Sequence, residues 1–433
     1  MNYYEVKVGV IGFGTVGAGV CSNLMRNGEV IARRTGIKLT LTAVADLDID
    51  SDRGVDVPKE ILTTSADELI DKVDVVVELI GGTTIAGDFI LKALKAGKPV
   101  VTANKALLAE KGELLFKTAQ ENDADIYYEA AVAGGIPVIK ALREGLVGNR
   151  IERIYGIMNG TCNYILTRME REGADFEPIL KDAQDLGYAE AEPSLDIDGY
   201  DTAHKAAILA ALAYGKWFGM DAIHVEGIRD ISLLDLRFAD ELGYRIKLLA
   251  VIKQNESGDV QVGVHPTLLP KSSQLAGIME VFNGVMITGD TVGDTLFYGR
   301  GAGRDATASA VVADLVDVAL NLKSGSVNRV PAFRESLLLE NLLPMDSVVC
   351  RYYLRLHVID KPGVVASISK ILGDKGISIS SIVQHEDPCD TNTVPVMILT
   401  HKIQEAKIKA AIKELEALDV VKEKVKLLRI EDI

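Results

Sequence analysis

Short apolar runs alternate with helix-like stretches over the first part of the chain. Runs rich in Val and Ile occupy residues 6–11, 39–45, 73–82 and 100–103. A helix-like run to about residue 34 follows the first of them, and another, residues 88–97, precedes the last. A further strand is predicted over residues 125–132, DIYYEAAV, which carries Glu129. Strands that alternate with helices in this way predict an α/β fold with a parallel, doubly wound sheet of the Rossmann type.

The pattern changes after Arg150. RIERIYGIMNGTCNYIL predicts a strand, a turn at residues 159–161 and a helix, and an all-apolar run, AAILAALA, follows Lys205. A helix that is apolar all round is normally buried. Strands are predicted around KLLAVI and VQVGVHPTLL, and a glycine-rich turn, YGRGAGRD, leads into a long helix that begins near Asp305. This middle part is therefore predicted to be α+β.

The last part of the chain is a small unit of its own. After an irregular stretch at residues 323–349, strand-like and helix-like segments follow in the order βαββαβ, from YYLRLHVID at residue 352 to VVKEKVKLLRI, which ends at residue 430. This order predicts a ferredoxin-like sandwich. A chain of 433 residues fits a prior of roughly three domains.

The first apolar run leads directly into GFGTVG, a G-x-G-x-x-G motif with Gly12, Gly14 and Gly17. In a strand–turn–helix context the first glycine permits the turn, the second lets a pyrophosphate approach the backbone, and the third lets helix and strand pack. The helix N-terminus then offers N–H donors to the phosphates. The motif predicts a dinucleotide-binding domain.

Asp46 ends the second predicted strand. An acidic residue there accepts hydrogen bonds from an adenosine ribose, which favours NAD(H). A capping role in the turn ADLDID explains Asp46 about equally well. No arginine follows Asp46 directly to bind a 2′-phosphate, so the sequence favours NAD(H) and leaves NADP(H) open.

Composition narrows the class of protein. The formal charge of −15 argues against nucleic acid or an anionic membrane surface as a partner. The four cysteines, Cys21, Cys162, Cys350 and Cys389, form no C-x-x-C pair, which fits a reducing compartment. The N-terminus has no signal-peptide pattern, and no apolar run is long enough to span a bilayer. We expect a cytoplasmic, multidomain, soluble protein.

The candidate chemistry lies in residues 185–205, DLGYAEAEPSLDIDGYDTAHK, where six carboxylates precede Lys205. Asp201 and Lys205 stand four residues apart and so share a helical face. An ordinary ion pair and an active-site pair explain them about equally well. Lys105 follows a predicted strand at the edge of the sheet where ligands bind in open parallel folds. Glu129, with the exposed backbone at Gly134 and Gly135, offers the oxygen ligands that hard cations prefer.

Together these segments resemble homoserine dehydrogenase with a C-terminal ACT domain. The resemblance spans essentially the whole chain and is carried by GFGTVG, TANKALLA, YYEAAVAGGIPVI, GIMNGTCNYIL, LGYAEAEPSLDIDGYDTAHKAAILA and YGRGAGRDATASAVV. The tail LHVIDKPGVVASISKILGDKGISISSI resembles the ACT module, which senses amino acids. No kinase-like segment precedes the glycine loop, so the chain resembles the monofunctional enzyme. The resemblance implies NAD(P)H-dependent interconversion of L-aspartate 4-semialdehyde and L-homoserine in threonine, methionine and isoleucine biosynthesis.

The resemblance also implies a role for each matching position. Lys205 would donate the proton, Lys105 would be a second cation, and Glu190 would bind the substrate's amino group, supported by Asp196 and Asp201. Besides the three glycines of the loop and Asp46, the cofactor would contact Phe13, Thr15, Val16, Lys105, Gly160 and Gly303. A sodium or potassium ion would be held by the Glu129 carboxylate and the backbone carbonyls of Val132, Gly134 and Ile136.

The resemblance sets the expected domain bounds and assembly. Residues 1–137, completed by a helix at about 304–322, would bind the cofactor, residues 138–303 would carry catalysis and dimerisation, residues 323–349 would be a linker, and residues 350–433 would form the ACT domain. A homodimer or homotetramer and an amino-acid effector, threonine first, are expected. One alternative is another ACT-containing dehydrogenase, such as a 2-hydroxy acid enzyme. It would require a histidine acid paired with a carboxylate and an arginine for the substrate carboxylate, and the sequence does not place such a trio. The other alternative is a non-catalytic amino-acid sensor.

Overall fold

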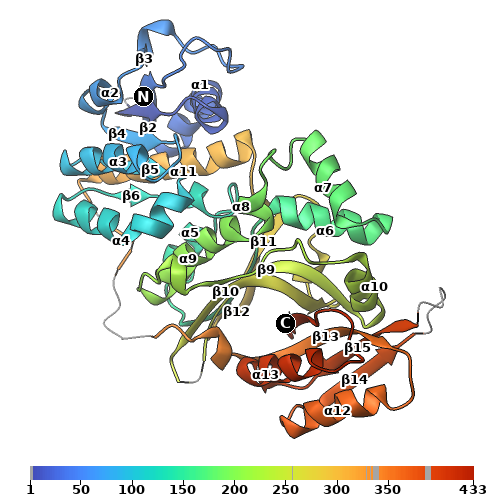
Figure 1. The fold of residues 1–433 in the computed structure, drawn as a ribbon. Coiled ribbons are helices and arrows are strands. Elements are labelled where there is room, and N and C mark those ends of the chain that lie inside the picture. Colours follow the sequence, from blue (N-terminus) through green and yellow to red (C-terminus); the bar gives the residue numbers. More distant parts are fainter. Residues whose placement is uncertain (1–2, 256, 328, 332, 335–340, 386–391) are drawn as a thin grey trace.

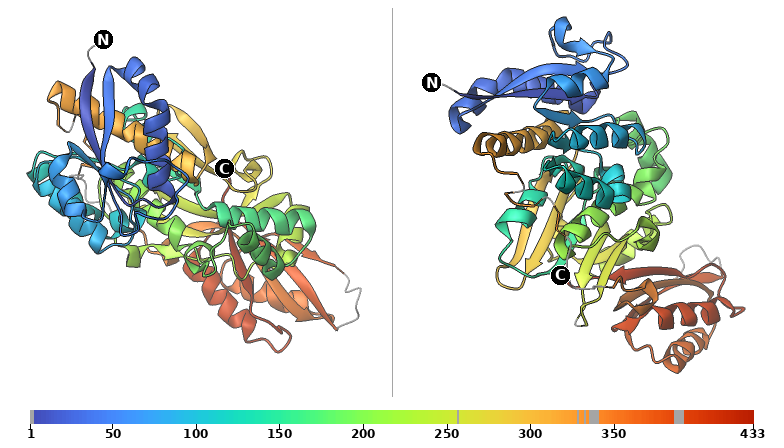
Figure 2. Two further views of the ribbon diagram at one scale, coloured as in Figure 1. Left: turned by 90° about the horizontal axis from the view of Figure 1, so that it is seen from above. Right: turned by 90° about the vertical axis from the view of Figure 1, so that its left-hand side faces the viewer.

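The computed structural model describes residues 3–255, 257–327, 329–331, 333–334, 341–385 and 392–433. It has two sheets, one at the N-terminal end and one that runs through the middle and C-terminal parts of the chain (Figure 1). The elongated arrangement is clear in Figure 2, where the N-terminal and C-terminal parts lie at opposite ends of the molecule.

The N-terminal sheet is parallel throughout and has the strand order β3-β2-β1-β4-β5-β6. This is the strand order of a dinucleotide-binding Rossmann fold, so the predicted fold class is confirmed. Its strands are β1 (Tyr4–Ile11), β2 (Ile37–Ala45), β3 (Leu62–Thr63), β4 (Val75–Glu78), β5 (Val100–Thr102) and β6 (Ile126–Tyr127). Its helices are α1 (Thr15–Thr35), α2 (Ala66–Lys72), α3 (Ile85–Lys95) and α4 (Lys105–Glu121), with a 3-10 turn, η1 (Lys59–Ile61).

Helix α11 (Arg304–Ser324) returns from the middle of the chain to this sheet. Its apolar residues, such as Val311 and Leu315, share one buried cluster with Val8 and Val10 of β1. It packs so closely on α1 that a Cβ atom at Gly19 would lie 2.8 Å from the carbonyl oxygen of Arg304. The N-terminal unit is thus built from two segments that are far apart in the sequence.

The middle of the chain forms a sheet whose long strands pair antiparallel, while the short β8 pairs in parallel with β10. Helices cover the side of this sheet that faces the N-terminal unit (Figure 1). Its strands are β7 (Ile151–Ile157), β8 (His224–Val225), β9 (Tyr244–Gln254), β10 (Val260–Pro270), β11 (Phe282–Gly289) and β12 (Gly293–Arg300). Its helices are α5 (Val138–Lys140), α6 (Gly160–Glu172), α7 (Phe176–Asp185), α8 (Ser194–Ile197), α9 (Tyr200–Tyr214) and α10 (Leu233–Glu241). Shorter turns are η2 (Glu129–Ala131), the π-turn η3 (Ala141–Gly145), η4 (Met220–Ala222) and η5 (Leu275–Gly277).

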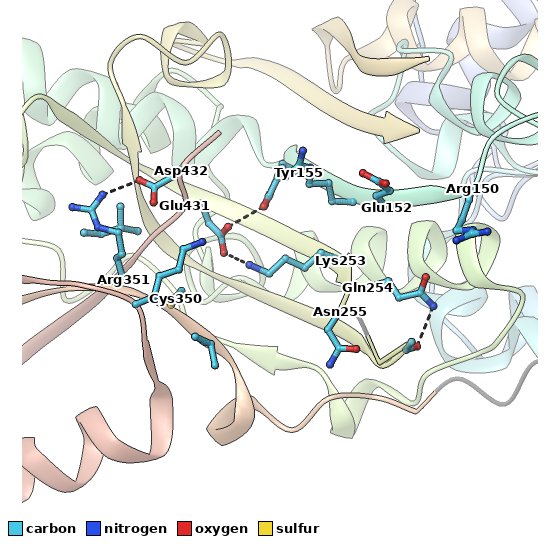
Figure 3. A pocket seen from close by; sticks show the side chains of 15 residues that line it. Arg150, Glu152, Tyr155, Lys253, Gln254, Asn255, Cys350, Arg351, Glu431 and Asp432 are labelled. Atoms are coloured by element: carbon cyan, nitrogen blue, oxygen red, sulfur yellow. Dashed lines mark hydrogen bonds and ion pairs between the residues drawn. The ribbon is translucent and has the colours of Figure 1, made fainter. Parts of the chain in front are cut away.

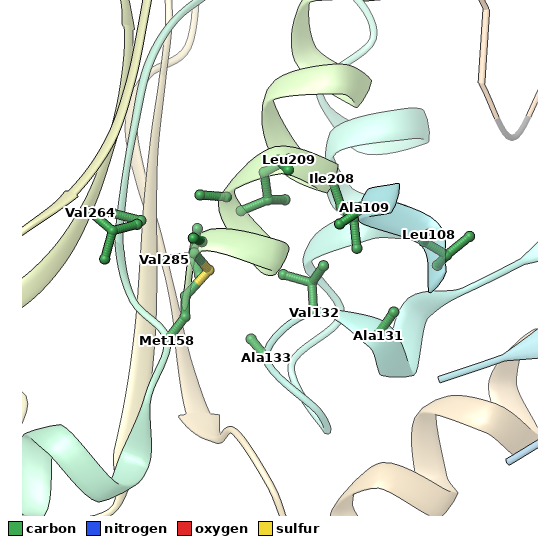
Figure 4. Packing of buried hydrophobic residues seen from close by; sticks show 14 of the residues in the cluster. Leu108, Ala109, Ala131, Val132, Ala133, Met158, Ile208, Leu209, Val264 and Val285 are labelled. Carbon is green, nitrogen blue, oxygen red and sulfur yellow. The ribbon is translucent and has the colours of Figure 1, made fainter. Parts of the chain in front are cut away.

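Helix α9, which carries Lys205, lies in the core between helix α4 of the N-terminal unit and the middle sheet. On one side Ile208 approaches Ala109 and Leu108 of α4, and on the other Val264 and Val285 come from strands β10 and β11 (Figure 4). Because both sides of α9 meet apolar neighbours, the all-apolar sequence of this helix is buried as predicted. Lys205 lies on the second turn of α9, because the helix begins at Tyr200.

The C-terminal unit has the predicted βαββαβ order: β13 (Val349–Ile359), α12 (Val364–Asp374), β14 (Ile379–Gln384), β15 (Thr393–Thr400), α13 (Glu405–Glu416) and β17 (Lys426–Ile430). Minor elements are η6 (Met345–Ser347) and β16 (Ile403–Gln404). Strand β17 also pairs in parallel with β10, so the sheet of this unit continues the middle sheet, in the order β12-β11-β7-β9-β10-β17-β13-β15-β14. The sequence did not predict this continuity.

One predicted element is wrong. Residues 125–132 were expected to form a strand, but β6 has only two residues and Glu129 begins the 3-10 turn η2. The cause is the carboxylate of Glu129, which accepts hydrogen bonds from the backbone N–H groups of Ile139 and Lys140, both at 2.8 Å. The chain must turn at Glu129 to make these bonds at the start of α5.

Some of the residues named in the sequence predictions lie outside the part of the chain that the structure describes. Cys21, Cys162 and Cys350 are free and buried, whereas Cys389 lies outside the described residues. Parts of the predicted linker, at residues 328, 332 and 335–340, also lie outside them. Among the helices that the structure describes, none is both long and apolar enough to cross a membrane.

Candidate active site

The glycine loop connects β1 to α1 and leaves room for a ligand. Gly12 has a φ of +102°, and a Cβ atom there would lie 2.7 Å from the backbone of Leu79. A Cβ atom at Gly17 would lie 1.9 Å from the carbonyl oxygen of Gly12, whereas nothing lies within 4 Å of one at Gly14. Helix α1 begins at Thr15, and its N-cap, Gly14, provides no side chain to bind the first N–H groups. Free N–H groups beside open space fit a pyrophosphate, so the residues present suit a dinucleotide cofactor.

Asp46 lies beside this loop. Its Oδ2 accepts a hydrogen bond from the Phe13 N–H at 2.5 Å, and its Oδ1 accepts one from the Asp48 N–H at 3.0 Å. The carboxylate therefore caps its own turn and also reaches the glycine loop. Two arginines that the sequence did not identify contact the segment that follows Asp46. Arg53 pairs with Asp48 at 2.9 Å, and Arg304 donates to the carbonyl oxygen of Gly54 at 3.3 Å.

The two candidate lysines meet at one carboxylate. Lys205 Nζ lies 2.6 Å from Asp201 Oδ2, and Lys105 Nζ lies 3.2 Å from Asp201 Oδ1. Asp201 and Lys205 are only 5% and 8% exposed, so they form a buried ion pair and not a solvated one on the surface. Burial alone would raise the pKa of Asp201, but the ammonium groups of Lys205 and Lys105 hold it well below its usual range. Asp201 is therefore a permanently charged counterion for two cations.

A third residue, Asn159, fixes this carboxylate. Its Nδ2 donates to Asp201 Oδ2 at 2.9 Å and to Asp196 Oδ1 at 2.7 Å, while its Oδ1 caps α6 through the Cys162 N–H. Burial, followed by the negative charge of Asp201, raises the pKa of Asp196. The sequence identified Asn159 only as a turn residue; its position as an N-cap directly after a strand was the available signal.

Lys205 has one further partner, the carbonyl oxygen of Met158, at 2.6 Å. Met158 directly precedes Asn159, so the end of β7 supplies one acceptor to Lys205 and one donor to Asp201. The ammonium group thus has two fixed acceptors and one remaining N–H direction. A substrate oxygen can take that third position.

Lys105 is placed by the parallel sheet. It is the first residue of α4, directly after β5, and the side chain of Asn104 caps that helix by accepting from the Leu107 N–H at 3.1 Å. Because β1 and β5 are parallel strands of one sheet, Lys105 and the glycine loop lie at the same edge. Lys105 therefore lies between the edge of the sheet that carries the glycine loop and the buried pair on α9.

The remaining predicted site residues, Glu190, Gly160 and Gly303, lie in loops and at helix starts. Glu190 is exposed on the loop before α8, and its carboxylate has no hydrogen-bond or ion-pair partner among the described residues. The loop nevertheless meets the turn at the start of α6, because Thr161 donates to the carbonyl oxygen of Tyr188 at 2.6 Å. Gly160 begins α6, and Gly303 is the N-cap of α11, with a φ of +115° and no atom within 4 Å of a Cβ built there.

The predicted cation ligands lie on the turn that follows β6. The backbone is left-handed at Ala133 (φ +54°) and Gly134 (φ +52°), while the Ile136 carbonyl accepts the Val138 N–H at 2.8 Å. Burial raises the pKa of Glu129 to about 7. One carboxylate with carbonyl oxygens suits a hard cation. No cluster of three or more His, Cys, Asp or Glu side chains suited to a metal occurs in the part of the chain that the structure describes.

The cavity shown in Figure 3, of about 550 Å³, lies elsewhere, between the middle sheet and the C-terminal unit. Glu431 at its centre accepts a hydrogen bond from the Tyr155 hydroxyl at 2.9 Å and pairs with Lys253 at 2.7 Å. None of the residues that line it belongs to the lysine pair or the glycine loop. The candidate chemistry is therefore not in this cavity.

The chain matches known proteins over its whole length. Family profiles described as "Homoserine dehydrogenase, NAD binding domain", "Homoserine dehydrogenase" and "ACT domain" match residues 12–129, 137–316 and 352–420. Homoserine dehydrogenases of Neisseria gonorrhoeae and Pseudomonas aeruginosa are 45% and 46% identical to it, with 99% of each chain covered.

Solved structures agree with these matches. The crystal structure of a homoserine dehydrogenase from Thiobacillus denitrificans is 45% identical, covers 100% of this chain and 99% of its own, and has a TM-score of 0.94. A hyperthermophilic archaeal homoserine dehydrogenase in complex with NADPH is 29% identical over 73% of this chain and 98% of its own, with a TM-score of 0.62. The chain belongs to the homoserine dehydrogenase family, as an oxidoreductase with a nicotinamide-binding domain and a C-terminal ACT domain.

Proposed function

We propose that this chain uses Lys205 as the proton donor in the reversible reduction of L-aspartate 4-semialdehyde to L-homoserine. The observation that carries the proposal is the convergence of Lys105 and Lys205 on one buried carboxylate, at the sheet edge that also holds the glycine loop. The nicotinamide cofactor, when bound, supplies the hydride. The protein must then supply a proton and stabilise charge at the aldehyde oxygen.

Lys205 suits the proton transfer. Its Nζ has two fixed acceptors, Asp201 Oδ2 and the Met158 carbonyl oxygen, so its third N–H is oriented toward the space they leave. A general acid has to lie within hydrogen-bond reach of the oxygen that it protonates, and positioned acids contribute about 10²–10⁴-fold to rate. Asp201 keeps the Lys205 ammonium oriented between turnovers.

Lys105 supplies the second positive charge. Its pairing with the other oxygen of Asp201 brings it within a side-chain length of Lys205. Two cations beside one carbonyl stabilise the negative charge that grows on its oxygen during reduction. Asp196 and the exposed Glu190 are carboxylates near this point in the sequence, and we assign them to the substrate's ammonium group, with Glu190 as its main partner.

We assign the cofactor to the glycine loop, with the phosphates at the N-terminus of α1 and the ribose near Asp46. The contact of Asp46 with the Phe13 N–H supports NAD(H). Arg53, which pairs with Asp48, and Arg304, which donates to Gly54, support NADP(H), because guanidinium groups bind phosphates well. Kinetics with both cofactors decide between them, and NAD(H) remains our first choice.

A sodium or potassium ion at Glu129 is part of the proposal. The carboxylate of Glu129 and the carbonyl groups of Val132, Gly134 and Ile136 are the oxygen ligands that it would use. Activity in potassium or sodium chloride should exceed activity in tetramethylammonium chloride at equal ionic strength. Equal rates in all three salts would remove the cation from the proposal.

The ACT domain supports regulation by an amino acid, and we assign threonine as the effector, acting on a homodimer or homotetramer. A titration of activity with threonine, isoleucine and methionine tests the assignment. Threonine should lower the rate at lower concentration than the other two. Inhibition by isoleucine or methionine alone would replace threonine as the effector.

The reaction itself is tested with purified protein, homoserine and either NAD⁺ or NADP⁺. The absorbance of the reduced nicotinamide should rise with at least one cofactor, and omission of homoserine is the control. An absence of signal with both cofactors, in protein that still binds one of them, would contradict the proposed reaction.

A further inference from the structure

One of the contacts that join the ACT domain to the middle sheet is made by a buried arginine. Arg429 lies on β17, the strand that pairs with β10, and it is 1% exposed. Its guanidinium group binds two carboxylates at once: Glu405 of the ACT domain, at 2.8 and 2.6 Å, and Glu226 of the middle domain, at 2.9 and 3.0 Å. Bidentate arginine–carboxylate pairs fix geometry more firmly than single hydrogen bonds do.

Glu226 is held from several directions. Its backbone N–H donates to the Val264 carbonyl oxygen at 2.7 Å, and its carboxylate also pairs with His224 at 2.7 Å. Burial would raise the pKa of Glu226, but hydrogen bonds from His224 and Arg429 lower it below its usual range. The carboxylate therefore stays charged and attached to Arg429 at neutral pH.

The residues that directly follow Glu226 pack against the turn that leads into the catalytic helix. A Cβ atom at Gly227 would lie 2.2 Å from the carbonyl oxygen of Ile197, and the Ile228 N–H donates to that same oxygen at 2.8 Å. Arg229 then pairs with Asp198 and donates to Ser194 at 2.8 Å. Residues 226–229 thus form a clamp on residues 194–199.

The clamped turn is the one that positions the candidate substrate site. It contains Asp196, which shares Asn159 with Asp201, and it ends at Gly199, the N-cap of α9. A Cβ atom at Gly199 would lie 3.2 Å from the Glu226 carbonyl oxygen. The backbone of Glu226 therefore packs closely on the start of α9, so a shift of this backbone would press on the turn.

We propose that Glu226 is a positioning residue for the substrate, held in register by Arg429 of the ACT domain. The ACT strand β17 thereby forms part of the support of the active site, through Arg429, Glu226 and the turn before α9. This role rests on the proposed function, since it assigns the substrate to the turn that carries Asp196.

The chain offers a matched control. Arg355 of ACT strand β13 also pairs with a carboxylate across the same domain boundary, that of Asp235, at 2.7 and 3.3 Å. Asp235 is more deeply buried than Glu226, with side-chain exposures of 0% and 38%. Asp235, however, lies on α10, and its other hydrogen bonds go to Ser232 at the start of that helix and to Tyr353. Asp235 supports the docking of the ACT domain without touching the turn before α9.

The test compares Glu226→Gln with Asp235→Asn. Both remove one charge from an interdomain pair, so both should lower the unfolding midpoint. Only Glu226→Gln should raise the KM for homoserine, by at least about fivefold, with the KM for the cofactor unchanged. Glu226→Asp, which keeps the charge, should recover part of this loss. A homoserine KM that is unchanged in Glu226→Gln, or raised equally in Asp235→Asn, would overturn the proposal.

A binding measurement separates this inference from the proposed reaction. Homoserine in the presence of oxidised cofactor should raise the unfolding midpoint of the wild type and of Asp235→Asn, and raise it less for Glu226→Gln. This readout requires no turnover, so it still tests the role of Glu226 if the assigned proton donor is wrong. An equal rise in all three proteins would also overturn the proposal.

Discussion

The glycine loop and the lysine pair lie at the same edge of the parallel sheet, but they are built in different ways. The loop uses backbone groups: Gly14 leaves open space, and the first N–H groups of α1 have no side-chain cap. The lysine pair uses buried charge: Asp201, two lysines and Asn159 form one connected network. A cofactor phosphate needs room and donors, whereas proton transfer needs a fixed acid. The two regions should therefore fail in different ways when they are altered.

The largest effect is expected at Asp201. Asp201→Ala removes the shared partner of two cations and leaves Lys205 buried without a counterion. Breaking a buried pair in this way costs about 3–5 kcal/mol of stability, and turnover should fall by at least about 10² as the acid loses its orientation. Denaturant unfolding and steady-state kinetics measure both effects. Retention of normal turnover in a stable variant would show that the lysines do not need Asp201.

Within the glycine loop, substitution of Gly17 should lower stability, whereas substitution of Gly14 should lower cofactor affinity. A Cβ atom at Gly17 would clash with the Gly12 carbonyl oxygen, so Gly17→Ala should destabilise the domain by about 1–3 kcal/mol or more. Gly14→Ala has space for its methyl group in the protein, so the fold should survive and cofactor affinity should fall about tenfold. Thermal unfolding and a fluorescence titration of reduced cofactor check this. Unchanged affinity in Gly14→Ala would place the phosphates elsewhere.

The smallest expected effect is on the way the unfolding midpoint changes at low pH. The pKa of Asp201 in the folded protein lies below its unfolded value of about 4, so the unfolded chain takes up this proton first as the pH falls. The stability that Asp201 contributes is complete above about pH 4 and is lost below it. The gap in unfolding midpoint between wild type and Asp201→Asn should therefore narrow by roughly 2–4 °C between pH 6 and pH 3. A constant gap would mean that lysines do not lower this pKa.

The same contrast explains what the sequence alone could predict. The glycine loop and the βαββαβ tail depend on local spacing, and both were predicted correctly. The pairing of Asp201 with Lys205 follows from helical spacing, but Lys105 reaches Asp201 only through the packing of α4 on α9. Asn159 and Arg429 were missed because their partners are far away in the sequence, at Asp201 and Glu226. The strand predicted at Glu129 is wrong because the chain turns there, where the Glu129 carboxylate accepts hydrogen bonds from the backbone of Ile139 and Lys140.

A second buried lysine provides the control for the central claim. Lys247 on β9 is 1% exposed, and its ammonium group donates to Asn163 at 2.7 Å and to the Ile278 carbonyl oxygen at 2.6 Å. Burial, together with nearby Arg245, lowers its pKa to about 7. Lys247→Met therefore removes a lysine that is even more deeply buried than Lys205 and whose hydrogen bonds go to residues other than Asp201. It reports the cost of the substitution itself.

The most direct measurement is turnover and cofactor affinity in Lys205→Met, compared with Lys247→Met. Turnover of homoserine should fall by about 10²–10⁴ in Lys205→Met, while the dissociation constant for the cofactor stays within about twofold of the wild type. Lys247→Met should keep most of its turnover. Full turnover in Lys205→Met, or a loss of cofactor binding that matches the loss of rate, would contradict the assignment of Lys205 as the proton donor.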